Sequence, residues 1–147
     1  MRPIRTILAA VDFSPHSTPV VDAAVTLAKH FGAKVRLVHA YDIPIPLVSP
    51  YEVAIPEPYL AETRRIAAEK LAALVDRVAA EGVAVDSVLS EVPAAAAIVR
   101  AAQECAADLV VIGTRGHTGL KHLLLGSVAE RTVRLAPCAV LTVKAAA

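Results

Sequence analysis

The sequence has 147 residues and a formal net charge of +1, so we expect a single domain over residues 1–147. We expect no nucleic acid among its partners, because nucleic-acid-binding domains usually carry a basic excess. The N-terminal apolar run is too short for a signal peptide, and no apolar stretch approaches the roughly 20 residues of a membrane-spanning helix, so we expect no membrane partner and a cytoplasmic location.

The beginning of the chain predicts a strand, a helix and a second strand. Ile4–Val11 ends in a continuous apolar run, as expected of a buried strand in a parallel sheet. A hydroxyl residue followed closely by proline can open a helix at either Ser14 or Ser17, and Gly32 then ends that helix. Lys34–Ala40 alternates polar and apolar residues, which is typical of a strand.

The middle of the chain begins with a proline-rich connection, Tyr41–Pro58. We expect it to lie outside helices and strands, because proline interrupts both. A helix follows over about Leu60–Glu81, where apolar residues recur at helical spacing. We then expect Val83–Ser90 to be a polar edge strand and Pro93–Ala106 to be a helix. Asp108–Ile112 has the apolar run of a central strand.

The remaining predicted elements are a helix over Val128–Leu135 that opens at Ser127, and a final strand, Ala139–Val143. Strands and helices therefore alternate along the chain. This alternation predicts an α/β fold in which right-handed crossovers build one doubly wound, five-stranded parallel sheet with helices on both faces. In such folds ligands bind beyond the carboxyl ends of the strands, where the strand order reverses.

Two features of the sequence fall at these predicted carboxyl ends. Asp12 follows the first strand, and a segment that contains Gly113, Gly116 and Gly126 follows the fourth, with Ser127 directly after the last glycine. We expect these glycines to adopt positive φ and to let backbone N–H groups approach a phosphate, together with the N-terminus of the next helix. The alternative is that the glycines serve only a tight turn and a helix cap, and that Asp12 caps the turn after its strand.

The histidines and serines give weaker signals. We expect His39 to be a hydrogen-bonded residue of the core or of the sheet edge. His117 and His122 alone make a weak metal site, because a third ligand is missing. No Ser-His-Asp constellation can be assembled with the serines that open helices, so we predict neither a catalytic residue nor a metal site.

The glycine-rich segment has a specific spacing. Two residues separate Gly113 from Gly116, nine separate Gly116 from Gly126, and Ser127 follows. This pattern resembles the G-x2-G-x9-G-[S/T] signature of the ATP-binding branch of the universal stress protein family. The first strand with Asp12 and the apolar run before Gly113 resemble the same family, and the likeness extends over essentially the whole chain.

The resemblance implies an adenine nucleotide alpha hydrolase-like fold with strand order 3-2-1-4-5, and a homodimer paired through the last strand. It also implies ATP as the ligand, with Mg²⁺ or Mn²⁺ held mainly by the phosphates. The implied binding residues are Ala10, Asp12, Ala40, Ile112, Gly113, Arg115, Gly116, Gly126, Ser127 and Val128. Among them Ala10 and Ala40 would line the adenine slot, Asp12 would hold the adenine or the ribose, and the others would surround the ribose and the phosphates.

One position departs from the family pattern. The family usually has glycine two residues before the proline that opens the third helix, and this chain has Glu91 there. The Glu91 carboxylate can crowd a ligand in the crevice, or it can point away at the strand end, which is the alternative we favour.

These features predict an ATP-binding regulatory protein of the stress response that acts as a nucleotide-dependent switch or scaffold. Two alternatives stay open. One is a slow ATPase, for which only Asp12 or His117 offers a base. The other is a nucleotide-free dimeric scaffold in which Glu91 closes the site. The sequence leaves open whether the chain is an enzyme.

Overall fold

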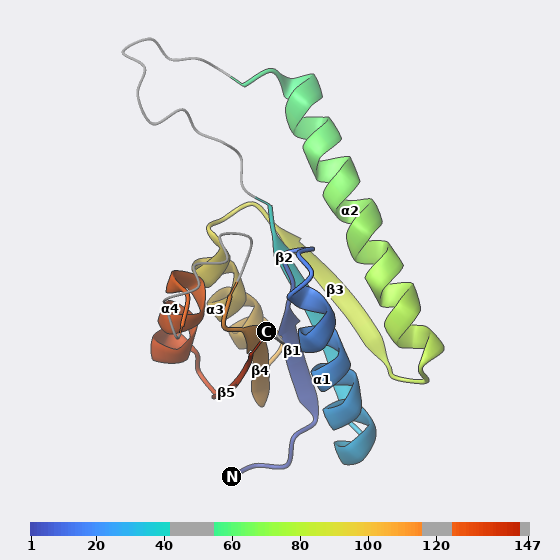
Figure 1. Cartoon of the computed structure of the whole chain (residues 1–147), viewed down its shortest axis with the longest axis vertical. Coiled ribbons are helices and arrows are strands. Elements are labelled where there is room, and N and C mark those ends of the chain that lie inside the picture. Colours follow the sequence, from blue (N-terminus) through green and yellow to red (C-terminus); the bar gives the residue numbers. More distant parts are fainter. Residues whose placement is uncertain (42–54, 116–124, 145–147) are drawn as a thin grey trace.

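The computed structural model of the chain describes residues 1–41, 55–115 and 125–144 (Figure 1). Its strands, in chain order, are β1 (Thr6–Ala10), β2 (Lys34–Ala40), β3 (Val85–Ser90), β4 (Leu109–Gly113) and β5 (Ala139–Val143). They form one five-stranded sheet in the order β3-β2-β1-β4-β5, and every neighbouring pair is parallel. The predicted fold class and strand order are therefore confirmed.

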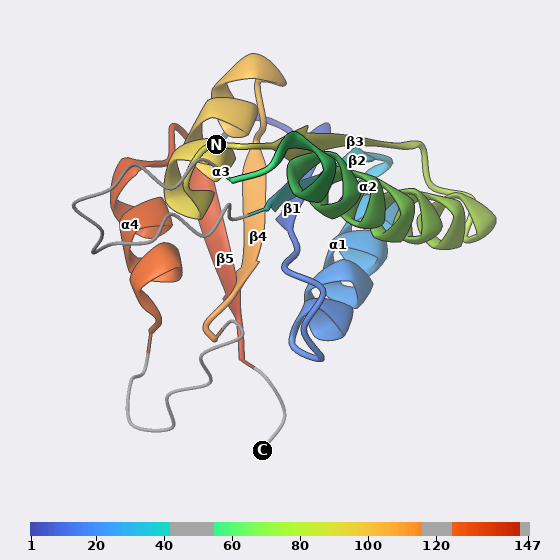
Figure 2. The same ribbon diagram turned by 90° about the horizontal axis from the view of Figure 1, so that it is seen from above.

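The helices of the described chain connect these strands. They are α1 (Ser17–Phe31), α2 (Glu57–Ala80), α3 (Ala94–Glu104) and α4 (Ser127–Leu135). α1 and α2 cover one face of the sheet, and α3 and α4 cover the other (Figure 2). Within the described residues, no helix has both the length and the apolar composition that a membrane crossing requires.

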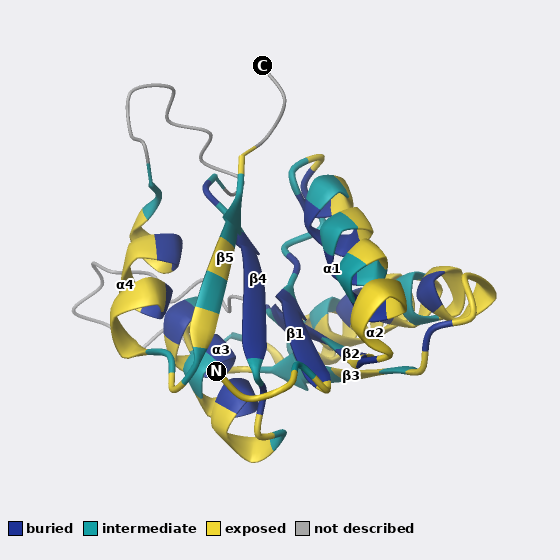
Figure 3. Cartoon of the chain, turned by 90° about the horizontal axis from the view of Figure 1, so that it is seen from below, coloured by how far each residue is buried: buried dark blue, intermediate teal, exposed yellow. Residues whose placement is uncertain are grey.

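The pleat of the central strands divides the core into two parts. Ile7 and Ala9 of β1 are buried on the side of α1 and α2, whereas Leu8 of β1 and Val110 of β4 are buried on the side of α3 and α4. Figure 3 shows buried residues along β1 and β4 and exposed residues on the outer sides of the helices. β1 and β4 are thus the buried centre of the sheet.

The structure defines the first residues of α1 and α2, which the sequence pattern did not fix. α1 begins at Ser17, the second of the two predicted positions. α2 begins earlier than predicted, at Glu57, with Pro56 as its N-cap and Pro58 in its first turn. The prediction that Pro58 lies outside helices was wrong, because the N–H groups of a first helical turn have no carbonyl partner and a missing N–H costs nothing there. Residues 42–54 of the proline-rich connection lie outside the described residues.

The burial pattern predicts how leucine truncation affects stability. Leu8 is fully buried, whereas Leu135 at the end of α4 is 54% exposed. We expect Leu8→Ala to lower the free energy of unfolding by about 2–5 kcal/mol, because it leaves a cavity between packed side chains. Leu135→Ala should change it by less than about 0.5 kcal/mol. Urea unfolding measures both variants, and equal losses would contradict this assignment of the core.

Candidate functional site

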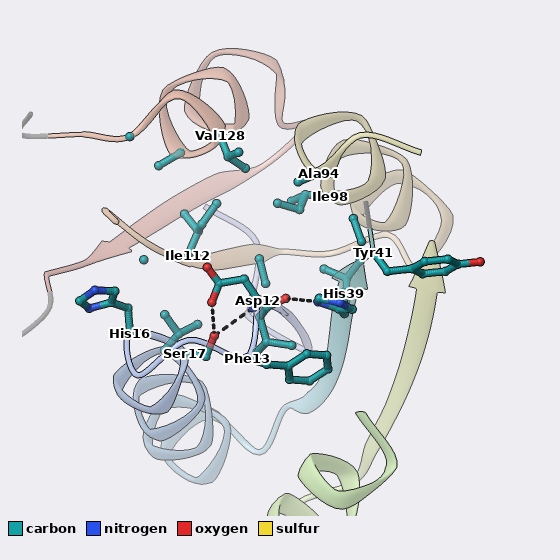
Figure 4. A pocket seen from close by; sticks show the side chains of 18 of the residues that line it. Asp12, Phe13, His16, Ser17, His39, Tyr41, Ala94, Ile98, Ile112 and Val128 are labelled. Carbon is teal, nitrogen blue, oxygen red and sulfur yellow. Dashed lines mark hydrogen bonds between the residues drawn. The ribbon is translucent and has the colours of Figure 1, made fainter. Parts of the chain in front are cut away.

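A crevice of about 590 Å³ opens at the carboxyl ends of β1 and β4 (Figure 4). The strand order reverses here, because the chain runs outward from β1 to β2 and β3 and then returns to β4 on the other side of β1. The helices that follow β1 and β4 cover opposite faces of the sheet, and this divergence opens a crevice between the strand ends. The crevice is lined by these strand ends, by the first turns of α1, α3 and α4, and by one side of α2.

Small side chains create an apolar slot on the α3 and α4 side of the crevice. Ala10 and Ala40 end β1 and β2, and they lie on the same sheet face as the buried Leu8 and Val38. Larger apolar side chains surround the space that these alanines leave: Val38, Ile98, Ile112 and Val128. The slot therefore suits a flat, apolar group.

Asp12 holds the turn that follows β1. Its Oδ1 accepts hydrogen bonds from the backbone N–H of Ser14 at 3.0 Å, from the Ser14 hydroxyl at 2.6 Å and from the Ser17 hydroxyl at 2.8 Å. The backbone N–H of Asp12 donates in turn to the Ser17 hydroxyl at 2.9 Å (Figure 4). Asp12 thus caps this turn, which was the alternative to a ligand-binding role in the sequence analysis. Asp12 is also the one carboxylate among the described residues that line the crevice.

The residue after Asp12 has an unusual backbone conformation. Phe13 has a φ of 62°, in the left-handed region that side-chain-bearing residues rarely adopt. Its ring packs against His39 with 4.1 Å between the ring centroids, and Lys70 Nζ lies 5.7 Å from the Phe13 centroid. His39 Nδ1 lies 2.8 Å from the carbonyl oxygen of Val11, and this nitrogen carries the proton because a carbonyl only accepts. His39 is thus a hydrogen-bonded strand residue, as predicted.

Gly113 and Gly126 border the crevice for a reason that differs from the predicted one. Neither glycine has a positive φ, and φ at Gly126 is −68°. A Cβ at Gly113 would lie 3.2 Å from the backbone oxygen of Arg115, and a Cβ at Gly126 would lie 3.1 Å from that of Thr114. The N–H of Gly126 donates to the same Thr114 oxygen at 2.8 Å. Close approach of backbone atoms, and not the left-handed region, disfavours a side chain at these two positions.

The first turn of α4 offers backbone donors at the crevice. The N–H of Glu130 donates to the carbonyl of Gly126 at 2.9 Å and makes the first hydrogen bond of the helix. The N–H groups of Ser127 and Val128 precede that bond, so no carbonyl of α4 can receive them. These amides and the positive end of the helix dipole favour an anion at this point, and Arg115 is one of the residues that line the crevice.

The structure brings the predicted binding residues together around one crevice. Those that line it are Ala10, Asp12, Ala40, Ile112, Gly113, Arg115, Gly126, Ser127 and Val128. Gly116, His117 and His122 lie outside the described residues. Within the ranges that the structure describes, no group of three or more His, Cys, Asp or Glu side chains is placed to hold a metal ion.

Sequence reasoning missed the α2 wall of the crevice, which is formed by Thr63, Ile66, Ala67 and Lys70. In the sequence these residues belong to an amphipathic helix. No local signal distinguishes them from residues that cover the sheet or face water, because their role depends on where α2 lies relative to the end of β2.

Glu91 does not line the crevice. It follows β3, and its carboxylate accepts hydrogen bonds from the side chains of Tyr41 and Arg64. The Tyr41 hydroxyl, and after it Arg64, lowers the pKa of the Glu91 carboxyl below its usual value. The carboxylate therefore points away from the crevice, as we favoured.

Comparisons with known proteins agree with this fold. The sequence model of the universal stress protein family matches residues 3–144. A universal stress protein of Thermus aquaticus, named for its place in the 3′ region of a QAH/OAS sulfhydrylase gene, is 36% identical over 146 residues, which cover 95% of this chain and 98% of the relative. A solved universal stress protein from Burkholderia pseudomallei is 30% identical, has a TM-score of 0.75, and each chain covers 97% of the other. A universal stress protein solved in complex with cAMP is 26% identical with a TM-score of 0.72, and the match covers 97% of this chain and 98% of that one.

The hydrogen bonds of the turn after β1 predict a stability effect at Ser17. We expect Ser17→Ala to lower the free energy of unfolding by about 1–3 kcal/mol, because both the N–H and the carboxylate of Asp12 lose a partner. Ser87→Ala is the matched control: Ser87 is exposed on β3, and its truncation should cost less than about 0.5 kcal/mol. Urea unfolding compares the two variants, and a Ser17→Ala loss no larger than that of the control would contradict this role of the hydroxyl.

Proposed function

This chain belongs to the universal stress protein family, and we propose that it is an ATP-binding regulatory protein of the stress response whose crevice holds the nucleotide. The observation that carries the proposal is the meeting of an apolar slot, the Asp12 carboxylate and the first amides of α4 at one crevice. These three features suit a purine base, a ribose and a chain of phosphates. ATP that binds one arrangement of the crevice better than another would shift the protein toward that arrangement, which is the basis of a nucleotide-dependent switch or scaffold.

In the proposed complex each part of the nucleotide meets a chemically matched wall. The adenine occupies the apolar slot beside Ala10 and Ala40. A ribose hydroxyl donates to Asp12, because a carboxylate accepts hydrogen bonds. The phosphates lie against the N–H groups of Ser127 and Val128, where the helix dipole favours negative charge.

A solved relative supports the choice of an adenine nucleotide. The universal stress protein that was solved in complex with cAMP has the same fold as this chain over nearly its whole length. cAMP contains the same adenine and ribose as ATP, so a crevice that binds cAMP also suits the adenine and the ribose of ATP. The longer phosphate chain of ATP is the part that the α4 amides and Arg115 would bind.

The proposal includes Mg²⁺ or Mn²⁺ held mainly by the phosphates. Asp12 is the one carboxylate in the described lining, and a divalent cation of this kind takes about six oxygen ligands. The described residues therefore supply too few ligands to hold such an ion alone. Phosphate oxygens and water supply the others when the ion arrives with the nucleotide.

The described crevice favours binding over hydrolysis. Phosphoryl transfer to water needs a group that positions the attacking water. Asp12 Oδ1 already accepts three hydrogen bonds from Ser14 and Ser17, so this oxygen serves the turn after β1 and not an attacking water. His117, the other base that the sequence offers, lies outside the described residues. We therefore propose a binding protein and assign no catalytic residue.

We also propose a homodimer that pairs through β5. β5 is an edge strand, with β4 on one side only. Leu141 of β5 is 39% exposed. An apolar edge strand is a template for pairing with another strand, and a second copy of the chain would cover it.

The nucleotide proposal predicts a measurable affinity for ATP that depends on Gly113. Isothermal titration calorimetry with ATP, ADP and GTP should show binding of ATP by the wild type, and Gly113→Val should weaken it by about tenfold or more. The physical reason is the space at Gly113, since a Cβ there would meet Arg115 and Val20. Absence of measurable ATP binding by the wild type would overturn the proposal.

Gly32→Ala is the matched control for this experiment. Gly32 has a φ of 67° at the end of α1, so alanine there costs stability without reaching the crevice. We expect ATP affinity to stay at the wild-type value in Gly32→Ala. An equal loss of affinity in both variants would show that general destabilisation, and not the crevice, explains the effect of Gly113→Val.

The proposed dimer predicts that a charge on β5 separates the subunits. We expect the wild type to sediment as a dimer and Leu141→Lys to sediment as a monomer, because a buried unpaired ammonium group is costly at an interface. Ser87→Lys places the same charge on β3, at the opposite edge of the sheet, and should leave the dimer intact. Sedimentation velocity measures all three proteins, and a dimeric Leu141→Lys would exclude pairing through β5.

A further inference from the structure

Two of the four residues that α2 contributes to the crevice, Thr63 and Ile66, belong to the part of the helix with the least burial. None of residues 57–66 is buried, whereas Ala67, Leu71 and Val78 further along the helix are buried against the sheet. Thr63 and Ile66 nevertheless line the crevice. Apolar burial therefore does not account for the position of this part of α2.

A polar cluster joins this part of α2 to the ends of two strands. Arg64 of α2 donates from Nη2 to Glu91 Oε1 at 2.7 Å and from Nε to the Tyr41 hydroxyl oxygen at 3.1 Å. The Tyr41 hydroxyl donates to the same Glu91 oxygen. Tyr41 follows β2, and its backbone N–H donates to the carbonyl of Ser90 at the end of β3 at 3.1 Å. Arg64, Tyr41 and Glu91 thus connect α2, β2 and β3 at one point.

The geometry at Tyr41 distinguishes this cluster from an ordinary surface ion pair. An exposed pair such as Arg64 with Glu91 contributes little when it stands alone. Tyr41, however, is only 5% exposed, and its side chain extends from the end of β2 toward β3 (Figure 4). Burial raises the pKa of Tyr41, so the hydroxyl keeps the proton that it donates to Glu91. The ion pair is therefore tied to a buried residue whose backbone N–H is bonded to the end of β3.

We propose that Glu91, through Tyr41 and Arg64, is a positioning residue that holds the α2 wall of the crevice in place for the ligand. Glu91 itself does not touch the crevice, whereas Tyr41 lines it and Arg64 is adjacent to Thr63, which lines it too. Among the residues that the structure describes, loss of the cluster would leave residues 57–66 of α2 without a side-chain hydrogen bond to the strand ends. The inference rests on the proposed binding of an adenine nucleotide.

Two variants and a matched control test this role. Glu91→Ala removes the shared acceptor, and Tyr41→Phe removes only the hydroxyl and keeps the buried ring. Glu62→Gln is the control, because Glu62 pairs with Arg65 on the exposed side of the same helix. The first readout is hydrogen–deuterium exchange of residues 61–70 in the ligand-free protein, and the second is ATP affinity by calorimetry.

We expect Glu91→Ala and Tyr41→Phe each to speed amide exchange in residues 61–70 severalfold and to weaken ATP binding by about three- to tenfold, because charge-assisted hydrogen bonds are the strong ones. The double variant that carries both substitutions should show the same amide exchange and the same ATP affinity as the more strongly affected single variant, since both substitutions act on one cluster. Glu62→Gln should leave exchange and affinity at wild-type values.

The two readouts separate failure of this inference from failure of the proposed function. Unchanged exchange in both variants would overturn the positioning role whatever ligand binds. Faster exchange with unchanged ATP affinity would also overturn it, because the wall would then have no bearing on the ligand. A wild type that binds no ATP would overturn the proposed function, and amide exchange alone would then decide whether the cluster holds α2.

Discussion

The parallel pairing of β1 with β4 is the interaction on which the rest of the structure depends. Ile7 pairs with Leu109, and the Asp108 carboxylate secures the start of the pair by accepting the backbone N–H groups of Arg5 at 2.9 Å and Thr6 at 3.0 Å. Parallel strands that start together also end together. The loop after the first strand and the loop after the fourth therefore meet at one edge of the sheet, although they lie far apart in the sequence.

Because of the pleat, the side chains on the two faces of β1 and β2 have different roles. Ala10 and Ala40 point to the side of α3 and α4 and leave the apolar slot, whereas Val11 and His39 belong to the opposite face and share a hydrogen bond. A shift of either strand by one residue would exchange these roles. The left-handed backbone at Phe13, which costs on the order of 1–3 kcal/mol, occurs where the chain turns away from this edge, and the ring of Phe13 packs against His39.

The two parts of α2 are held by different interactions, the later part by apolar burial and the earlier part by hydrogen bonds. Leu71 and Val78 anchor the later part of the helix in the core, where apolar burial is strong but has no preferred direction. The earlier part lies beside the crevice, where a ligand must enter and a continuous apolar contact would close the opening. Arg64 and Glu91 can hold the helix there because hydrogen bonds specify direction and tolerate water nearby.

The sequence by itself determined the α/β class and, through the glycine spacing of its family, the strand order and the residues of the crevice around Asp12, Gly113 and Ser127. Hydrophobic periodicity and strand ends are local features, so they can be read without knowing the fold. Only the tertiary structure decided that Gly113 is needed for close backbone approach, that Glu91 points away from the crevice, and that α2 forms a wall of it. The last two depend on the distance between segments far apart in the chain, and a local pattern carries no information about such distances. The first depends on how the backbone turns between Gly113 and Arg115, which the spacing of glycines does not specify.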